Sequence, residues 1–279
     1  MMQFGISTAC FFGTEYVEDA IEKIGRQGCK TIEVFLNTFS EYEEEYIREI
    51  RRRIDAYGMK VCSVHPHGVQ YEPQLFSPYS RSTRDAEAIY RRVLRAAQLL
   101  GASNYILHGG LFFKPALKNT VNFARIGPIV SHMADVAKEY GIRLAYENVH
   151  WCWFQRPDFA TEIQKYVESD NLYFNFDIKQ AAQSGFPPMS YLEPMGNRLV
   201  SIHVCDYIAN PPYWNPCMPF RGQMDFAALR SYLQDTGFAG SMVMEVYSGN
   251  YRDEEELFAT YRQMVDFFTA PADISQSSL

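Results

Sequence analysis

The sequence predicts a single (β/α)8 barrel, also called a TIM barrel, with its functional site at the C-terminal face of the strands. Eight short runs rich in β-branched and aromatic residues alternate with longer stretches of helical periodicity along the 279 residues, and such alternation is typical of a parallel sheet. The ends of consecutive runs lie between 26 residues (Ser7 to Glu33) and 43 residues (His65 to His108) apart, which leaves room for one crossover helix each. The total length is that of one such barrel.

The strand predictions rest on short runs of mostly apolar residues, as expected for a parallel sheet that is buried on both faces. No Gly-x-Gly-x-x-Gly motif follows the first run, which argues against a dinucleotide-binding fold. In chain order the predicted strands are Gln3–Ser7, Thr31–Phe35, Lys60–His65, Asn104–His108, Arg143–Asn148, Leu172–Asp177, Leu199–Val204 and Ser241–Tyr247.

The helix predictions rest on apolar residues that recur every three or four positions, as Ile47, Ile50 and Ile54 do. A residue that suits a helix C-cap precedes six of the strands; it is Asn171 once and glycine five times, at Gly28, Gly58, Gly101, Gly141 and Gly237. The predicted helices include Tyr16–Gln27, Glu41–Tyr57, Ser82–Leu100, Ile126–Tyr140, Asp158–Glu168, Phe226–Asp235 and Glu254–Phe268. We therefore expect one barrel domain over residues 1–270 and a polar C-terminal tail over 271–279.

Composition excludes several classes of protein. Lys plus Arg number 26 and Asp plus Glu 33, which gives a formal charge of −7 and argues against a nucleic-acid partner. No apolar run is long enough to span a membrane. The first residues lack the features of a signal peptide, so we expect a cytoplasmic location, where the six scattered cysteines are reduced.

The most informative pattern is the type of residue at the strand ends. In a barrel these ends converge on one mouth, where several unpaired carboxylates would each cost several kcal/mol of desolvation. A divalent cation removes this conflict, whereas any one of these residues alone is more often a solvated or hydrogen-bonded side chain. The strand-end residues are Glu33, His65, His108, Glu147, Asp177, His203 and Glu245.

Four of these segments carry a family resemblance. Glu147-Asn148, Phe176-Asp177, His203-Val-Cys-Asp206 and Met244-Glu245 are similar to the xylose-isomerase-like barrel superfamily, which includes sugar isomerases and epimerases, inosose dehydratase and the relatives of endonuclease IV (AP endonuclease family 2 type). The segment 219–226 also resembles a family segment, except that Phe220 replaces its first glycine.

The resemblance implies a metal site formed by Glu147, Asp177, His203 and Glu245. Three carboxylates and one imidazole suit Mn²⁺ or Mg²⁺, with Co²⁺ or Zn²⁺ as alternatives. The implied activity is that of an isomerase or epimerase of a keto-sugar or polyol, which works by proton transfer through a metal-stabilised enediolate. The two glutamates, Glu147 and Glu245, would exchange the proton.

Two departures from the family leave the substrate open. Gln180 stands where many members have a histidine, and Trp153 stands where the ketose 3-epimerases have a glutamate that grips the substrate. A metal-dependent lyase, either a keto-polyol dehydratase or a glycoside-cleaving enzyme, is the first alternative. An endonuclease IV-like phosphoesterase or a non-catalytic sugar-binding barrel is less favoured.

Further residues are expected to contact the substrate, a small carbohydrate that we expect to be unphosphorylated. We expect His65 and His108 to hydrogen-bond sugar hydroxyls or a leaving group, or one of them to act as a general acid; the alternative is that both are neutral pocket walls. Lys179 is expected to point away from the metal. The candidates for substrate binding are His65, His108, His150, Gln180, Arg221, Trp153 and Glu33. Aromatic rings suited to sugar faces crowd the same loops, namely Phe11, Phe12, Phe112, Phe113, Trp151, Trp153, Phe154, Tyr213, Trp214 and Phe220. The resemblance also predicts a homo-oligomer.

Overall fold

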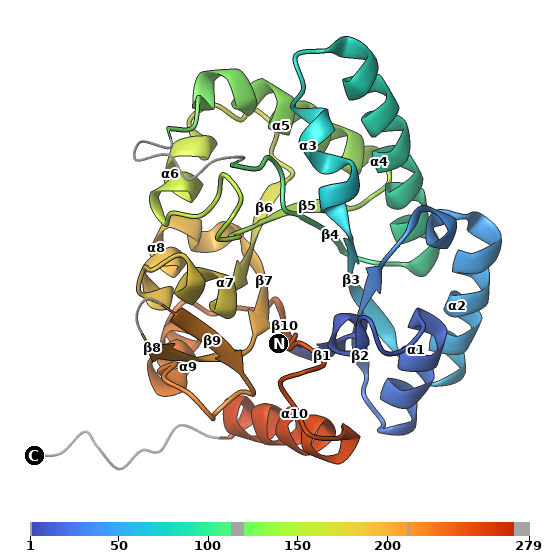
Figure 1. The fold of residues 1–279 in the computed structure, drawn as a ribbon, viewed down its shortest axis with the longest axis vertical. Coiled ribbons are helices and arrows are strands. Elements are labelled where there is room, and N and C mark those ends of the chain that lie inside the picture. The colour runs from blue at the N-terminus through green and yellow to red at the C-terminus, as the bar shows by residue number, and fades with distance from the viewer. Residues whose placement is uncertain (1, 113–119, 211–212, 271–279) are drawn as a thin grey trace, which may run out of the picture.

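The computed structural model describes residues 2–112, 120–210 and 213–270, and it confirms the predicted barrel. Eight parallel strands close in the order β1-β10-β7-β6-β5-β4-β3-β2, and helices surround them (Figure 1). The predicted tail and Phe113 lie outside the described residues. The barrel strands are β1 (Gln3–Ser7), β2 (Thr31–Leu36), β3 (Lys60–Pro66), β4 (Asn104–Leu107), β5 (Arg143–Glu147), β6 (Leu172–Asp177), β7 (Leu199–Val204) and β10 (Ser241–Met244).

The helices follow the predicted order, with several short elements added. Long helices cover the barrel, and three short ones together with an antiparallel hairpin were not predicted, because segments this short carry little periodicity. The hairpin consists of β8 (Asp206–Asn210) and β9 (Tyr213–Cys217). The helices are α1 (Val17–Arg26), α2 (Glu44–Ala56), α3 (Glu72–Leu75), α4 (Ser80–Leu100), α5 (Phe123–Glu139), α6 (Asp158–Gln164), α7 (Ile178–Gln183), α8 (Leu192–Met195), α9 (Phe226–Asp235) and α10 (Glu254–Thr269).

Strand alternation separates the core from the site. In β6, Phe174 and Phe176 pack into the main hydrophobic core, which lies between the strands and the helices. Side chains on a strand alternate in direction, so the intervening residues of β6, Asn175 and Asp177, point into the barrel. The same alternation applies to β5 and β7, which bring Glu147 and His203 to the mouth, and Glu245 reaches it directly after the end of β10.

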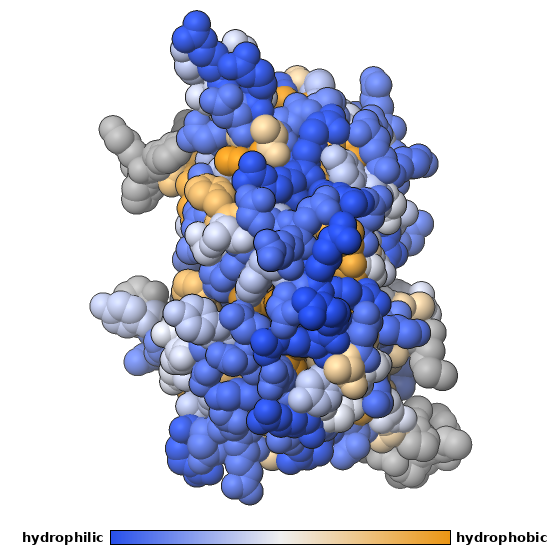
Figure 2. Space-filling view, turned by 90° about the vertical axis from the view of Figure 1, so that its right-hand side faces the viewer, coloured by the Kyte–Doolittle hydropathy of each residue, from blue (hydrophilic) through white to orange (hydrophobic). Residues whose placement is uncertain are grey.

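The outer surface is charged. Figure 2 shows a largely hydrophilic face on the side of α2 and α4, with apolar residues scattered over it. Arg92 pairs with Glu43 at 3.1 Å and Arg95 with Glu44 at 2.9 Å, although exposed pairs of this kind contribute little stability. No helix in the described part of the chain is long and apolar enough to cross a membrane.

The five glycines have the backbone conformation of the predicted helix C-caps, and Asn171 does not. Asn171 is absent from the residues with positive φ, because α6 already ends at Gln164; its side-chain amide instead donates to the carbonyls of Ala134 and Ile142, both at 2.8 Å. The five glycines all have positive φ: Gly28 (77°), Gly58 (63°), Gly101 (67°), Gly141 (74°) and Gly237 (64°).

This geometry predicts the cost of a side chain at Gly141. A Cβ there would meet no atom within 4 Å, so Gly141→Ala adds backbone strain alone and should lower the free energy of unfolding by about 1 kcal/mol. Gly249 is the matched control, because a Cβ there also meets nothing and its φ is not left-handed. Gly249→Ala should change the free energy by less than about 0.5 kcal/mol. Equal effects in urea unfolding would contradict this account.

Candidate active site and metal centre

A cavity of about 200 Å³ opens at the carboxyl ends of the barrel strands. Its floor is polar and its upper wall is mostly aromatic. A larger groove, of about 790 Å³, lies between α4 and α5, but every group in the described chain that could hold a metal lies in the barrel mouth. The residues that line the cavity are Ala9, Phe12, Phe35, His65, His67, Val69, His108, Glu147, Trp151, Asp177, Lys179, Gln180, Glu245 and Tyr247.

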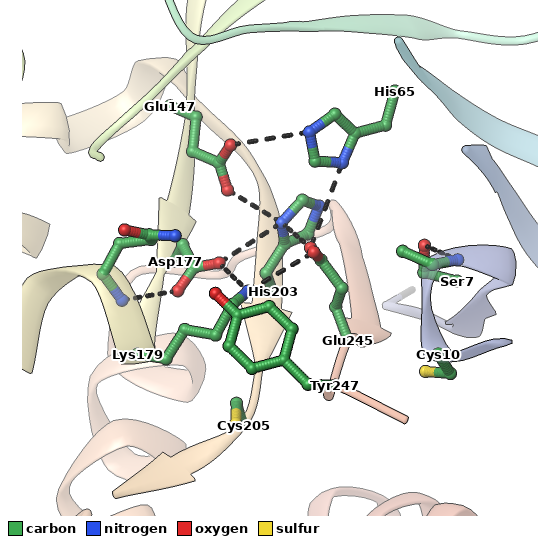
Figure 3. Close-up of polar contacts among 12 residues, drawn as sticks. Ser7, Cys10, His65, Glu147, Asp177, Lys179, His203, Cys205, Glu245 and Tyr247 are labelled. Carbon is green, nitrogen blue, oxygen red and sulfur yellow. Dashed lines mark hydrogen bonds and ion pairs between the residues drawn. The ribbon is translucent and has the colours of Figure 1, made fainter. Parts of the chain in front are cut away.

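Four strand-end residues meet on the floor of this cavity. One ligand atom from each of Glu147, Asp177, His203 and Glu245 lies within 4.8 Å of the others, and all four residues are buried. His203 is central, since its Nδ1 atom lies 2.9 Å from Glu147 Oε1 and 3.6 Å from Asp177 Oδ2, and it also contacts Glu245 Oε2 (Figure 3). The structure thus brings together the four residues that the family resemblance singled out.

Glu33 lies beneath this group and orients His203. His203 Nε2 lies 3.1 Å from Glu33 Oε2, which also accepts a 2.6 Å hydrogen bond from Ser63 Oγ. A hydrogen on Nε2 that is donated to Glu33 leaves the Nδ1 atom to face Glu147 and Glu245. Carboxylates hold metal-binding histidines in this way, so the geometry favours an orienting role for Glu33 over direct contact with a substrate.

Two further histidines border the same site. His65 Nε2 lies 2.9 Å from His108 Nε2, and His108 Nε2 lies 2.8 Å from Glu147 Oε2. His65, His108 and Glu147 form a second group with metal-ligand spacing. The pair therefore stands beside one of the two glutamates and faces the cavity.

A buried carboxylate on α3 holds the loop that carries His108. Glu72 is fully buried and accepts hydrogen bonds from the backbone N–H groups of His108 and Gly109, both at 2.9 Å, and from Tyr105 Oη at 2.7 Å. Burial raises the pKa of Glu72, although these donors act in the opposite direction. The side chain fixes the end of β4 against α3.

The donor atoms of the site fit a cation. Glu245 Oε2 and His203 Nδ1 are buried and in contact, yet neither makes a hydrogen bond; Glu33 Oε1 and His65 Nδ1 are also without one. Buried polar atoms are normally satisfied. Glu245 Oε2 and His203 Nδ1 both belong to the four-residue group, face each other and lack a hydrogen-bond partner. This arrangement is expected of two atoms that coordinate the same metal ion.

Lys179 corrects one sequence-based expectation. Instead of pointing away, its Nζ atom lies 2.5 Å from Asp177 Oδ2 and 3.3 Å from Glu245 Oε1, and the side chain is only 2% exposed. The physical reason is local, since α7 begins at Ile178 directly after β6. The alternation of the strand therefore ends at Asp177, and the first helical turn brings Lys179 back to the mouth.

The two cations of the site, His203 and Lys179, keep the carboxyl group of Glu245 ionised. Burial alone would raise the pKa of Glu245, but His203 and Lys179 outweigh it and lower that pKa to about 2. Burial would likewise lower the pKa of His203, but Glu245, Glu33 and Glu147 together raise it well above its ordinary value. The carboxylates and cations of the floor thus stabilise one another's charged forms.

The remaining predicted substrate contacts are divided. His65, His108 and Gln180 line the cavity, and His150 adjoins it through Gln180, with Nδ1 2.6 Å from Gln180 Oε1. Trp153 and Arg221 do not line it. Trp153 packs on Phe76 and against Gly110, and Arg221 is exposed on the segment after the hairpin.

The segment 219–226 shows why Phe220 is unusual. It has a φ of 66°, the left-handed conformation that suits glycine, and it occupies the position where the resembled family segment has a glycine. The centroid of its ring lies 4.6 Å from the ring centroid of Phe226 and 5.3 Å from that of Phe267. Gly222 N–H donates to Asp206 Oδ2 at 2.8 Å, which ties the segment to the hairpin.

Sequence reasoning missed several lining residues. Phe35 lies two residues after Glu33 on the same face of β2, a spacing that could have identified it. Phe12 and Trp151 belong to the aromatic loops already noted. Tyr247 lies two residues after Glu245 in the predicted strand Ser241–Tyr247, so the same spacing could have identified it, although β10 itself ends at Met244.

Fold and site together define a class, a (β/α)8 barrel whose C-terminal face carries a buried cluster of carboxylates and histidines that could hold a metal. The model of the xylose isomerase-like TIM barrel family matches residues 21–269, and the chain belongs to this family. The family predicted from the sequence is therefore confirmed.

Individual relatives agree with this assignment. The uncharacterized protein MJ1311 of Methanocaldococcus jannaschii is 25% identical over 284 residues, which cover 95% of this chain and 91% of the relative. The structure of IOLI protein with a bound zinc atom has a TM-score of 0.79 at 17% identity and covers 96% of this chain and 98% of that chain. D-psicose 3-epimerase with D-tagatose from Clostridium cellulolyticum H10 has a TM-score of 0.78 at 20% identity with the same coverage. At these identities the structural likeness shows the fold.

The lowered pKa of Glu245 predicts a loss of stability in acid for protein held in EDTA. Folding depresses this pKa from 4.5 to about 2, so the ionised carboxylate stabilises the fold above pH 4.5, and this contribution is lost as the pH falls towards 2. It amounts to about 3 kcal/mol at most. Between about pH 5 and 3, urea unfolding should show a steeper loss for the wild type than for Glu245→Gln. Parallel curves would contradict the charge balance described above.

Proposed function

We propose that this protein is a divalent-metal-dependent isomerase or epimerase that acts on a small keto-sugar or polyol by proton transfer. The observation that carries the proposal is the placement of two buried, ionised glutamates on one cavity floor. Glu147 is the last residue of β5 and Glu245 directly follows β10. The strands β6 and β7 separate β5 from β10 in the barrel, and the two glutamates flank His203 (Figure 3).

The residues that would hold the metal are Glu147, Asp177, His203 and Glu245. Their oxygen-rich set suits Mn²⁺ or Mg²⁺, with Co²⁺ or Zn²⁺ as alternatives. When bound, such an ion supplies Lewis acidity that makes the hydrogen beside a sugar carbonyl more acidic. The unsatisfied atoms of His203 and Glu245 support this assignment.

The two glutamates would move the proton. Because the pKa values of both carboxyl groups are lowered, each glutamate is a base at neutral pH. One glutamate would accept a proton from the substrate carbon, and the second glutamate would face the opposite side of that carbon. His108, 2.8 Å from Glu147, would orient that glutamate. Return of that proton by the same glutamate to the neighbouring carbon would complete an isomerisation. An epimerisation would need the second glutamate, after it has taken a proton from solvent, to donate that proton to the opposite face of the original carbon.

The residues of the cavity walls favour a carbohydrate as the substrate. Phe12, Phe35, Trp151 and Tyr247 line the cavity above the polar floor, and aromatic rings stack on the apolar C–H faces of sugars. One structural neighbour is an epimerase that holds D-tagatose, which favours a sugar of similar size.

Proton exchange tests the proposal. The wild type, supplied with Mn²⁺ and screened against keto-sugars in D₂O, should exchange one carbon-bound hydrogen of its substrate with solvent. Glu147→Gln and Glu245→Gln should each reduce this exchange by at least about 100-fold, because a general base is lost. Glu193→Gln, at an exposed position, is the matched control and should exchange normally. Retained exchange in both site variants would exclude the mechanism.

Metal content provides a second prediction. After reconstitution with Mn²⁺ and dialysis, plasma mass spectrometry should find about one ion per chain in the wild type and a large loss in Asp177→Asn. The asparagine keeps an oxygen that can accept from Gln180 N–H, as Asp177 Oδ1 does at 2.8 Å, so the fold of α7 is preserved. Two or three zinc ions per chain would favour a phosphoesterase, and no metal under any loading condition would favour a sugar-binding barrel.

A metal-dependent lyase is the second candidate. The observation that favours it is the His65–His108 pair, which faces the cavity beside Glu147 and would supply a proton to a leaving group. Release of water or of an aglycone during turnover would distinguish this reaction from isomerisation.

A further inference from the structure

Lys179 is a cation inside the candidate metal centre, and the family resemblance assigns it no role. Its Nζ atom donates to Asp177 Oδ2 at 2.5 Å and lies 3.3 Å from Glu245 Oε1. It also lies over the ring of Tyr247, 5.5 Å from the centroid. Lys179 and its carboxylate partners are buried, and the lysine lines the cavity.

The oxygens of Asp177 are already divided between two partners. Oδ1 accepts the backbone N–H of Gln180 at 2.8 Å, which caps α7. Oδ2 is the oxygen that faces His203 Nδ1, at 3.6 Å, and it is the same atom that Lys179 holds. Asp177 therefore has one oxygen to offer a metal, and an ammonium group occupies it.

Glu245 shows the same division. Its Oε1 atom lies beside Lys179, and its Oε2 atom contacts His203 and lies 4.0 Å from His65 Nδ1. A divalent ion among the four ligands would thus lie next to the ammonium group, and two cations that share carboxylates in a buried site repel each other strongly. Binding of a metal ion by the four ligands is therefore unfavourable while the ammonium group of Lys179 stays in its present position.

The cavity offers the displaced ammonium group a new position. Lys179 has a flexible four-carbon stem and lines the cavity together with Tyr247, over whose ring its ammonium group lies. Once it leaves Asp177 Oδ2, the ammonium group remains near Glu245 Oε1 and faces the cavity, where the oxygens of a bound sugar would be further acceptors.

We propose that Lys179 is an internal counter-cation that competes with the divalent metal for Asp177 Oδ2 and, when the metal displaces it, donates to an oxygen of the substrate. The inference rests on the proposed function for the metal and the sugar. On this proposal, Lys179 weakens metal binding when no substrate is present, and metal binding and substrate binding are coupled through its side chain.

Isothermal titration with Mn²⁺ alone tests the competition. Lys179→Met removes the positive charge while keeping a long side chain, and it should bind Mn²⁺ at least about tenfold more tightly than the wild type. Lys179→Arg keeps the charge and should not bind more tightly. Lys138→Met, at an exposed lysine that pairs with Asp170, is the control and should match the wild type. Equal or weaker binding by Lys179→Met would overturn the proposal.

Thermal unfolding provides a readout that does not depend on activity. In EDTA, Lys179→Met should melt at a lower temperature than the wild type, because Asp177 and Glu245 lose their counter-ion. Saturating Mn²⁺ should then raise its melting temperature more than that of the wild type. If the methionine variant does not fold without metal, Lys179→Gln, which keeps a hydrogen-bond donor, is titrated in its place with the same expectation.

The two proposals fail in different ways. Tight Mn²⁺ binding and proton exchange by the wild type, with no gain in affinity for Lys179→Met, would overturn the role of Lys179 and leave the proposed function intact. If neither the wild type nor the variant binds Mn²⁺, both proposals are wrong. A gain in affinity without proton exchange on any keto-sugar would support the competition and reject the reaction.

Discussion

Electrostatic repulsion among four carboxylates buried at one mouth is the constraint on which this structure depends. Glu33, Glu147, Asp177 and Glu245 are nearly excluded from water, and isolated charges in such a place would be costly. His203 lies between Glu33 and the other three, and Lys179 bridges Asp177 and Glu245. Because removal of one partner from a buried ionic group leaves an uncompensated charge, each of these residues fixes the positions of the others.

Much of the fold could be predicted from the sequence, because a (β/α)8 barrel repeats one simple pattern. The positions of β1, β6 and β7 agree residue by residue with the predicted runs, since apolar, β-branched segments leave few alternatives. Prediction failed where an element is short or depends on tertiary contacts. Asn171, for example, uses its side chain to bind two distant carbonyls, and no local pattern indicates this.

The candidate ligand group could also be predicted, because a strand end fixes where a side chain points. Asp177 and His203 are the last inward residues of their strands, and register pairs them directly. Side chains beyond the strand ends follow no such rule. Lys179 turns back because a helix starts immediately after Asp177, whereas Arg221 points to solvent because a hairpin and a strained turn at Phe220 carry its segment outward.

The carboxylate of Glu72 makes one side of the mouth rigid, because it ties α3 to the end of β4. It accepts three hydrogen bonds from Tyr105, His108 and Gly109, and any local opening between α3 and the end of β4 would break all three while leaving a buried carboxylate without donors. Such an opening costs roughly several kcal/mol, by the range for hydrogen bonds to a charged group. The amide hydrogens of His108 and Gly109 should therefore exchange slowly with solvent, and entry of a ligand would rely on motions elsewhere around the rim.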